Sequence, residues 1–239
     1  MTLPGERVAV VTGGTRGIGA AITRALIPEV GAVIAVARDR VEMDGVEVLT
    51  CDVTDASAVT NTLDGIGQID VLINNAGTST SNPIERTSDD DWHTMLSVNA
   101  TAPFLCSRAV VPGMKERGFG RIVTVASTAG LHGSPYITAY TASKHAAVGL
   151  TRALAAELED TGVTASAVCP TYVKTEMTDR TIRNISERTG AGIEDSWRRL
   201  ADLTPHGRIL QPEEVADAVI DLIGDPTANG QIRELDGGS

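Results

Sequence analysis

A short apolar run and the glycine-rich turn after it, Val8-Ala-Val-Val-Thr12-Gly-Gly-Thr-Arg-Gly-Ile-Gly19, decide the fold of this chain. The apolar run predicts a strand, and residues 17–27 predict a helix because their apolar side chains recur with helical spacing. This order leaves backbone N–H groups at the helix N-terminus, where an anionic phosphate can bind. The spacing is Gly-x-x-x-Gly-x-Gly and not the usual Gly-x-Gly-x-x-Gly, but its context favours a dinucleotide site over a turn without ligand.

The glycines of the turn have different steric tasks. Gly13 can adopt the tight turn, and Gly17 lets the backbone approach a pyrophosphate. Gly19 permits close packing of the helix on the strand.

Apolar runs of strand length alternate with amphipathic, helix-length segments along the whole chain. The predicted strands are Val8–Thr12, Val33–Ala37, Val46–Cys51, Ile69–Asn74, Arg121–Ala126, Val163–Cys169 and Gln231–Leu235. They predict an α/β fold, a Rossmann-type doubly wound parallel sheet of about seven strands with helices on both faces. The connection from Arg38 to Val46 is too short for a crossover helix and predicts a loop. We expect a single domain over residues 1–239, with a helical lid inserted at about 177–205.

Composition and charge exclude several function classes. The net charge is −11, which argues against nucleic acid or an anionic membrane as a partner. No apolar run approaches the roughly 18 residues of a membrane span, and the start lacks the features of a signal peptide. The cysteines Cys51, Cys106 and Cys169 match neither a disulfide framework nor a zinc site. We therefore expect reduced cysteines and a cytoplasmic protein.

Tyr140 and Lys144 stand four residues apart, so on a helix both project from one face. A phenol has a pKa of about 10, and a nearby ammonium and the positive nicotinamide of an oxidised cofactor would favour the phenolate and lower that pKa. Ser127 follows an apolar strand, at the edge where α/β sheets bind ligands. A core tyrosine with a snorkelling lysine is the alternative, but the position of Ser127 and the glycine turn favour a nicotinamide-dependent carbonyl or alcohol oxidoreductase.

The residues near the end of the second strand select between the two nicotinamide cofactors. Arg38 follows Ala37, and Arg16 lies inside the glycine turn, so two guanidinium groups can converge on a 2′-phosphate. This favours NADP(H), although Asp39 comes next and NAD(H) remains possible.

Taken together, these motifs resemble those of the short-chain dehydrogenases/reductases of the single-domain type, from about Arg7 to Gly238. The resemblance rests on Thr12–Gly19, Asp52-Val53, Asn74-Asn-Ala-Gly77, Asn99, Ser127, Tyr140 with Lys144, Pro170 with Thr175, and Asp236-Gly-Gly. It implies a catalytic tetrad of Asn99, Ser127, Tyr140 and Lys144. The predicted cofactor-binding residues are Gly13, Thr15, Arg16, Gly17, Ile18, Gly19, Arg38, Asp52, Val53, Asn75, Ala76, Gly77, Tyr140, Lys144, Pro170, Val173 and Thr175.

The resemblance also implies individual roles. Asp52 and Val53 would flank the adenine, Thr175 would bond the carboxamide of the nicotinamide, and Asn99 would hold a water that links Lys144 to solvent. The chain departs from the family pattern at Pro170-Thr171, where the family usually has Pro-Gly, and in the short connection after Arg38. The threonine would narrow the space beside the nicotinamide, and the short connection would expose the adenine end of the cofactor.

The substrate pocket is predicted from fewer signals. Its expected walls are the lid and the residues Leu131, His132, Tyr136 and Tyr172. His132 could contact substrate, or it could be a solvated or structural residue, which is commoner for a histidine in a loop.

The sequence of the C-terminal third is similar to that of family members that reduce 3-oxoacyl thioesters or polyketide-type ketones. The expected activity is therefore reversible reduction of such a ketone to a secondary alcohol, with an acyl-CoA or a carrier-protein thioester as possible substrate. An NAD-dependent dehydrogenase of a hydroxyacyl-CoA, hydroxy acid or steroid-like alcohol is one alternative, and a catalytically silent nucleotide sensor is another. The family resemblance also implies a homotetramer, paired through helices near residues 101–117 and 140–160.

Overall fold

Parallel strands form one sheet in the order β3-β2-β1-β4-β5-β6-β7 in the computed structural model, which describes residues 7–238. The strands are β1 (Val8–Thr12), β2 (Ala32–Ala37), β3 (Glu47–Thr50), β4 (Val71–Asn74), β5 (Gly120–Val125), β6 (Val163–Pro170) and β7 (Ile232–Leu235). All six strand pairings are parallel, so the predicted doubly wound seven-stranded sheet is confirmed.

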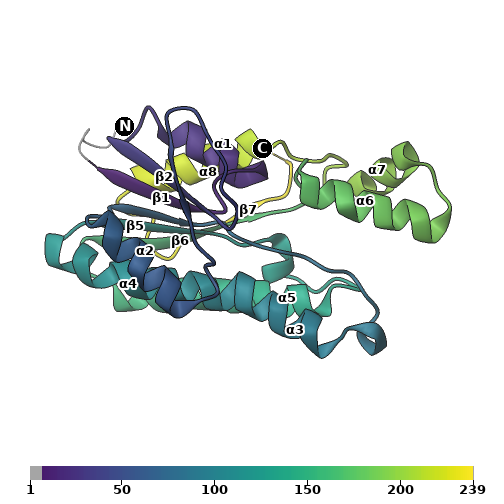
Figure 1. Cartoon of the computed structure of the whole chain (residues 1–239). Helices are drawn as coiled ribbons and strands as arrows, with labels where there is room; N and C mark the ends of the chain where they lie inside the picture. The colour runs from purple at the N-terminus through teal and green to yellow at the C-terminus, as the bar shows by residue number, and fades with distance from the viewer. Residues whose placement is uncertain (1–6, 239) are drawn as a thin grey trace.

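Helices cover both faces of this sheet. The helices are α1 (Gly17–Leu26), α2 (Ala56–Ile66), α3 (Asp89–Leu96), α4 (Ala102–Arg117), α5 (Thr138–Glu157), α6 (Glu176–Thr189), α7 (Ile193–Asp202) and α8 (Pro212–Gly224). Short helical turns are η1 (Ile84–Arg86), η2 (Ser97–Thr101) and η3 (Thr128–Gly130). Helices α1 and α8 pack together on one face, and α2, α4 and α5 lie on the other (Figure 1). Among residues 7–238, no helix is both long and apolar enough to cross a lipid bilayer.

The core has two main layers because successive side chains of a strand point to opposite faces. In β1, Ala9 and Val11 join the apolar cluster beneath α1 and α8, whereas Val10 joins the cluster beneath α2 and α4. Strands β4 and β5 alternate in the same way: Leu72 and Ile122 face α2 and α4, and their neighbours face α1 and α8. Burial on both faces explains why the central strands are almost continuously apolar.

The edge strand β3 is shorter than predicted. Val46 pairs with Met43 in an isolated antiparallel bridge, around a turn in which Gly45 has φ +73°, so it does not join the parallel ladder. Glu47 and Thr50 are exposed, as an edge strand allows. The predicted loop from Arg38 to Val46 is confirmed.

The expected insertion near residues 177–205 is helical, as predicted. It consists of α6 and α7, which extend from the sheet as an arm (Figure 1). The polar sequence suits this position, because much of the surface of both helices faces solvent.

Candidate active site

The site lies at the carboxyl edge of the sheet, where the chain order reverses between β1 and β4. Here Asn75, which follows β4, donates from its side-chain amide to the carbonyl oxygens of Thr12 (2.9 Å) and Gly13 (3.1 Å). The Thr12 hydroxyl accepts the backbone N–H groups of Asn75 (3.0 Å) and Ala76 (3.1 Å). These bonds join the glycine turn to the segment after β4 at the switch point, where open α/β sheets bind ligands.

The glycine turn is shaped for close approach of an anion. Gly13 and Gly17 have φ +63° and +52°, in the left-handed region that favours glycine, and a Cβ on Gly19 would overlap the Gly13 carbonyl. The first bond of α1 runs from Ala20 N–H to Arg16 O (3.1 Å), and the Arg16 side chain makes no capping bond to any described residue. The N–H groups ahead of that bond are therefore available at a positive helix end, which fits the pyrophosphate of a dinucleotide.

Ser127, Tyr140 and Lys144 meet beside this turn. Ser127 lies two residues after the end of β5, and Tyr140 and Lys144 lie one turn apart at the start of α5. The Ser127 side chain lies close enough to Tyr140 to act on the pKa of the phenol, and Lys144 Nζ lies 5.8 Å from the centre of the Tyr140 ring. Lys144 is only 5% exposed, and its Nζ donates to the Val125 carbonyl oxygen (2.9 Å).

Burial dominates the ionisation of this group of residues. It raises the pKa of Tyr140, while the hydrogen bond from Ser127 acts in the opposite direction. Burial lowers the pKa of Lys144 to about 8. The lowering of the Tyr140 pKa that we expect from the Lys144 ammonium and an oxidised nicotinamide stays a prediction.

Asn99, the fourth tetrad candidate, lies in the π-helical turn η2, which joins α3 to α4. Its side-chain amide bonds both the N–H and the carbonyl of Thr78 (2.9 Å each), just after the Asn74–Gly77 motif. It also donates to the Ser143 hydroxyl (3.0 Å). The expected water between Asn99 and Lys144 stays a prediction.

Comparison with known proteins identifies the family. The family model of short chain dehydrogenases matches residues 7–185. This chain is a short chain dehydrogenase. It is therefore an oxidoreductase, as its sequence motifs predict.

Three relatives span nearly the whole length of this short chain dehydrogenase. A Streptomyces coelicolor protein with the provisional name ketoacyl reductase is 37% identical over 244 residues, which cover 94% of this chain and 92% of that protein. The 3-oxoacyl-[acyl-carrier-protein] reductase FabG of Vibrio harveyi is 33% identical over 252 residues, covering 100% and 98%. The crystal structure of a single-residue variant of actinorhodin polyketide ketoreductase with NADPH has a TM-score of 0.89 and 34% identity, covering 100% and 98%.

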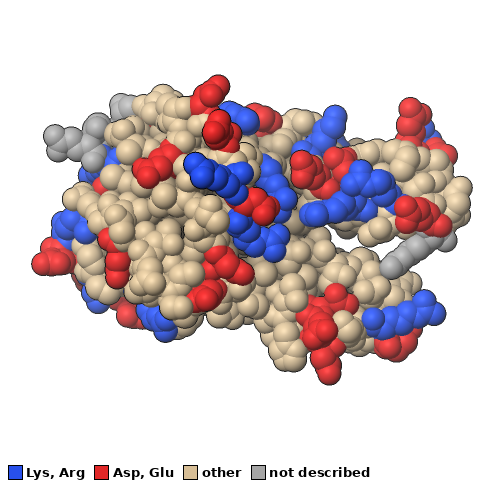
Figure 2. Space-filling view, viewed as in Figure 1, with Lys and Arg blue, Asp and Glu red and all other residues tan. Residues whose placement is uncertain are grey.

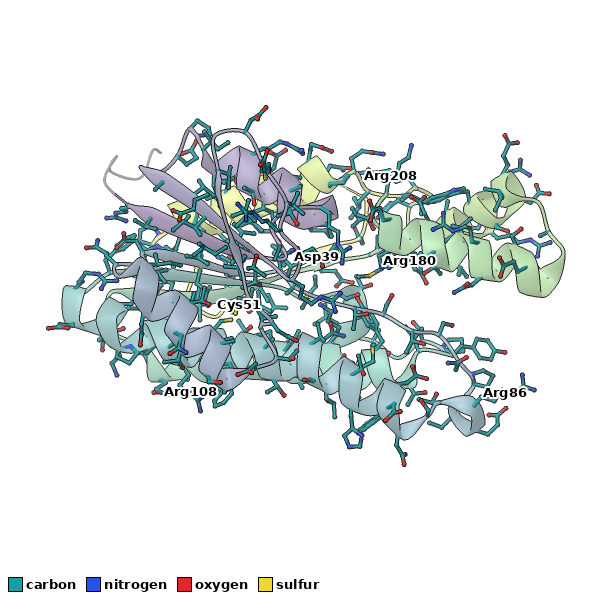
Figure 3. All side chains as sticks on the ribbon, in the orientation of Figure 1. Asp39, Cys51, Arg86, Arg108, Arg180 and Arg208 are labelled. Carbon is teal, nitrogen blue, oxygen red and sulfur yellow. The ribbon has the colours of Figure 1, made fainter. Side chains whose placement is uncertain are left out.

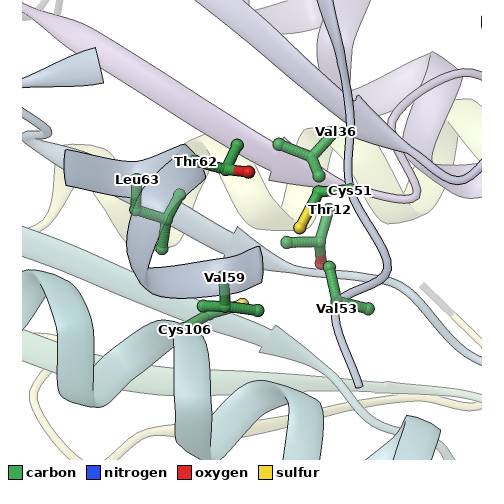
Figure 4. A pocket seen from close by; sticks show the side chains of 8 residues that line it. All are labelled: Thr12, Val36, Cys51, Val53, Val59, Thr62, Leu63 and Cys106. Atoms are coloured by element: carbon green, nitrogen blue, oxygen red, sulfur yellow. The ribbon is translucent and has the colours of Figure 1, made fainter. Parts of the chain in front are cut away.

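The predicted adenine end of the cofactor site lies at the ends of β2 and β3. The exposed Asp52 has a lowered pKa, chiefly because Thr54 bonds its carboxylate and in smaller part because Arg38 is close. Arg38 and Asp52 therefore lie close together. This is expected if Arg38 binds the 2′-phosphate and Asp52 flanks the adenine of the same cofactor. A small cavity beneath this region is lined by Thr12, Val36, Cys51, Val53, Val59, Thr62, Leu63 and Cys106 (Figure 4).

Thr175 lies beside the glycine turn. A side-chain carbon on Gly17 would come within 3.3 Å of the Thr175 methyl group, so segments far apart in sequence are in contact here. Thr175 also caps α6, because its hydroxyl accepts the Thr178 N–H (3.4 Å). The residue predicted to contact the nicotinamide thus also begins the α6–α7 arm.

The predicted substrate residues have different surroundings. His132 is 68% exposed at its side chain, and its Nε2 lies 3.5 Å from a carboxylate oxygen of Glu234 in β7. Tyr136 has φ +68°, and its carbonyl accepts the Asn82 N–H (2.8 Å). Tyr172 is half-buried and lies close enough to Tyr140 to raise the pKa of that phenol.

Leu131 is half-buried and packs against the apolar cluster of Ala126, Val148, Ala167 and Cys169. Of the four predicted wall residues, Tyr172 is thus the one with an electrostatic link to Tyr140.

Positive and negative side chains are mixed around the mouth of the site. Lys and Arg atoms gather in the middle of the visible face, near the start of the α6–α7 arm, with Asp and Glu atoms beside them (Figure 2). Figure 3 places Asp39, Arg180 and Arg208 in this region. Arg208 is bound through two hydrogen bonds to Glu214 (2.6 and 3.0 Å), and Arg198 is paired with Asp195 (3.1 Å). These two arginines are therefore partly neutralised within the chain.

Sequence reasoning missed two buried residues that contact the predicted tetrad. Ser143 bonds Asn99, and Cys169 lies close enough to the Ser127 backbone N–H for that group to act on the pKa of the thiol. Burial raises the pKa of Cys169 to about 11, so the thiol beside Ser127 is neutral. Neither contact has a signal in sequence spacing, since each joins segments more than 40 residues apart.

Proposed function

We propose that this short chain dehydrogenase reduces a ketone to a secondary alcohol with NADPH, in a reversible reaction, and that Tyr140 transfers the proton. One observation carries the proposal. The Tyr140 phenol lies close enough to Ser127 for that side chain to act on its pKa, and it lies beside Lys144, at the same sheet edge as the glycine turn. A proton donor, a second hydroxyl and a cation at a dinucleotide site suit the reduction of a carbonyl group.

Each residue of the group has a distinct task. Tyr140 gives its proton to the carbonyl oxygen, and its raised pKa keeps the phenol protonated beforehand. The Ser127 hydroxyl bonds the same oxygen as negative charge develops there. The Lys144 ammonium then stabilises the phenolate that Tyr140 becomes. Bound NADPH would supply the hydride to the carbonyl carbon.

The chain offers a set of groups that fits this cofactor. The N–H groups at the start of α1 would bind the pyrophosphate, and Arg16 and Arg38 the 2′-phosphate. Asp52 and Val53 would flank the adenine, and Thr175 would bind the carboxamide. The similarity to a ketoreductase that crystallised with NADPH supports the choice of NADP(H) over NAD(H).

We further propose a 3-oxoacyl thioester or a polyketide-like ketone as the substrate class. The support is the naming of the relatives: a ketoacyl reductase, a 3-oxoacyl-[acyl-carrier-protein] reductase and a polyketide ketoreductase. The thioester could be carried by CoA or by a carrier protein.

Steady-state oxidation of NADPH and NADH, measured side by side, tests this function. The ketones are acetoacetyl-CoA, a bicyclic decalone and a simple aryl ketone. We expect turnover with NADPH preferred, and a loss of about 10²–10⁴-fold in kcat for Tyr140→Phe with NADPH binding retained. A preference for NADH would favour the dehydrogenase alternative. Cofactor binding without turnover of any ketone or alcohol would favour the nucleotide sensor.

We also propose a cytoplasmic homotetramer. All three cysteines are free and buried, which fits a reducing compartment. The outer face of α5 presents the exposed small residues Ala146, Gly149 and Ala153, and α4 exposes Phe104, so close helix packing between subunits is sterically possible. Light scattering after size-exclusion chromatography measures the mass directly, and a monomer at micromolar concentration would refute the assembly.

A further inference from the structure

Ser143 stands between Tyr140 and Lys144 in the sequence, and its hydroxyl is enclosed by protein. The residue has no exposed surface, and Asn99 beside it is 1% exposed. We infer that Ser143 is a positioning residue for the proposed ketone reduction: it locks the Asn99 amide and couples it to the backbone of Tyr140. This inference rests on the proposed function.

The orientation of the Asn99 amide follows from its partners. The Thr78 N–H can only donate, so the atom 2.9 Å from it must be the oxygen Oδ1. The nitrogen Nδ2 then faces the Thr78 carbonyl (2.9 Å) and the Ser143 hydroxyl (3.0 Å). Each proton of the amide has one of these acceptors, and Met95 Sδ lies 3.8 Å from the same nitrogen as a weaker third contact.

The proton of Ser143 is placed by the same reasoning. Its oxygen accepts from Asn99, so its own O–H is free to donate, and the Tyr140 carbonyl oxygen lies 2.8 Å away. The result is a chain of bonds from Thr78 through Asn99 and Ser143 to Tyr140. In a buried site, only one arrangement of the donors and acceptors satisfies every hydrogen bond of this chain. The geometry of the residues in it is therefore fixed.

The bonds tie three parts of the proposed site together. Thr78 follows the Asn74–Gly77 motif, Asn99 lies in η2, and Ser143 lies in α5. A Cβ built on Gly77 would stand 3.3 Å from Asn99 Oδ1 and 3.7 Å from Lys144 Nζ, so the motif is in contact with both. Ser143 thereby sets the distance between the helix that carries Tyr140 and Lys144 and the segment predicted to line the cofactor.

Removal of the hydroxyl leaves one Asn99 N–H with only Met95 Sδ, a weak acceptor 3.8 Å away, in a buried site. An unpaired buried polar group is costly, so the amide is expected to rotate or admit water, and the start of α5 to shift. Shifts of an ångström or less at reacting groups reduce the rate more than they reduce binding.

The chain offers a matched control on the same helix. Thr151 is 2% exposed, and its hydroxyl also donates to a carbonyl one turn earlier, that of Ala147 (3.0 Å), two turns away from the site. Ser143→Ala and Thr151→Val each remove one buried hydroxyl from α5 and leave the carbon skeleton in place. Only Ser143→Ala removes a hydrogen bond to Asn99.

The experiment measures kcat, KM and NADPH affinity for both variants. Ser143→Ala is expected to lower kcat about 10- to 100-fold and to change KM and the fluorescence-titrated NADPH affinity about twofold or less. Thr151→Val should keep the wild-type kcat. Ser143→Thr, which restores the hydroxyl, should recover most of the lost rate. Hydrogen exchange of the Thr78 amide should quicken in Ser143→Ala only, whatever the activity.

Several results would overturn the inference. They are a wild-type kcat in Ser143→Ala, an equal loss in Thr151→Val, or unchanged Thr78 exchange. If Ser143→Ala does not fold, Ser143→Cys takes its place, since a thiol is a poor hydrogen-bonding partner of similar shape, and a wild-type kcat there has the same meaning. A wild-type protein that reduces no ketone rejects the proposed function, whereas wild-type turnover with an unaffected Ser143→Ala rejects only the role of Ser143.

Discussion

The ammonium of Lys144 donates to the carbonyl oxygen of Val125 at 2.9 Å, within the interior of the protein. No carboxylate contributes to the pKa of Lys144, which burial lowers from 10.5 to about 8. A cation in such surroundings is costly for the fold, and the cost is itself a measurable property of the site.

The first prediction concerns stability as a function of pH. The folded pKa of Lys144, about 8, lies below its unfolded value of 10.5, so the unfolded chain binds more protons between these values and stability rises with pH there. Lys144→Met carries no ammonium group, so its stability does not include the cost of burying that charge. Its free energy of unfolding relative to wild type should therefore fall by about 3 kcal/mol as pH rises from 8 to 10.5. Urea unfolding of both proteins measures the difference, and a value independent of pH would contradict it.

The order of strands and helices could be predicted from the sequence for a physical reason. A strand buried on both faces, such as Ala32–Ala37, is almost continuously apolar, and it stands out against the amphipathic helices. Glycine turns and catalytic motifs directly follow strand ends, so the sheet itself collects them at one edge. Predicted strand boundaries differ from the structure by one or two residues: β4 begins at Val71 and not at Ile69, and at the edge Val46 turns back toward Met43.

Properties that depend on tertiary burial could not be predicted. The raised pKa of Tyr140 depends on how far neighbouring residues from separate segments shield the phenol from water. The bond between Asn99 and Ser143 joins positions 44 residues apart, and the direction of His132 depends on where β7 places Glu234. The spacing of residues along the chain does not indicate which of them come into contact in the folded protein.

The second prediction tests the cofactor preference. Arg38→Asp should move the ratio of kcat/KM for NADPH over NADH toward NADH by about 10- to 100-fold, since a charge-assisted bond to the phosphate is lost and an acceptor for a ribose hydroxyl is gained. Arg40→Asp is the control, because Arg40 is an exposed arginine of the same loop. An unchanged ratio in Arg38→Asp, or an equal shift in Arg40→Asp, would void the assignment of Arg38.

The third prediction concerns the glycine turn. An alanine methyl at Gly19 would overlap the Gly13 carbonyl, so Gly19→Ala must displace the turn. We expect NADPH affinity to fall at least about tenfold. Gly65 in α2 has no atom within 4 Å of its would-be Cβ, and Gly65→Ala should stabilise the fold by up to about 1 kcal/mol with NADPH affinity unchanged. Calorimetric titration and thermal unfolding check both, and normal NADPH binding by Gly19→Ala would refute the close packing.

The last prediction separates Tyr172 from His132 at the substrate pocket. His132 lies beside Glu234, so His132→Ala should change the KM for the ketone about twofold or less. Tyr172 raises the pKa of Tyr140, so Tyr172→Phe should lower it. Because reduction needs the protonated phenol, the rate of Tyr172→Phe should begin to fall at a lower pH than that of the wild type.

Profiles of kcat/KM between pH 6 and 11, with His132→Ala as the matched control, measure this shift. If the alkaline limb of Tyr172→Phe coincides with that of the wild type, Tyr172 does not act on Tyr140 during turnover. If instead His132→Ala raises the KM tenfold or more, His132 contacts the substrate, and its pairing with Glu234 must open when the ketone binds.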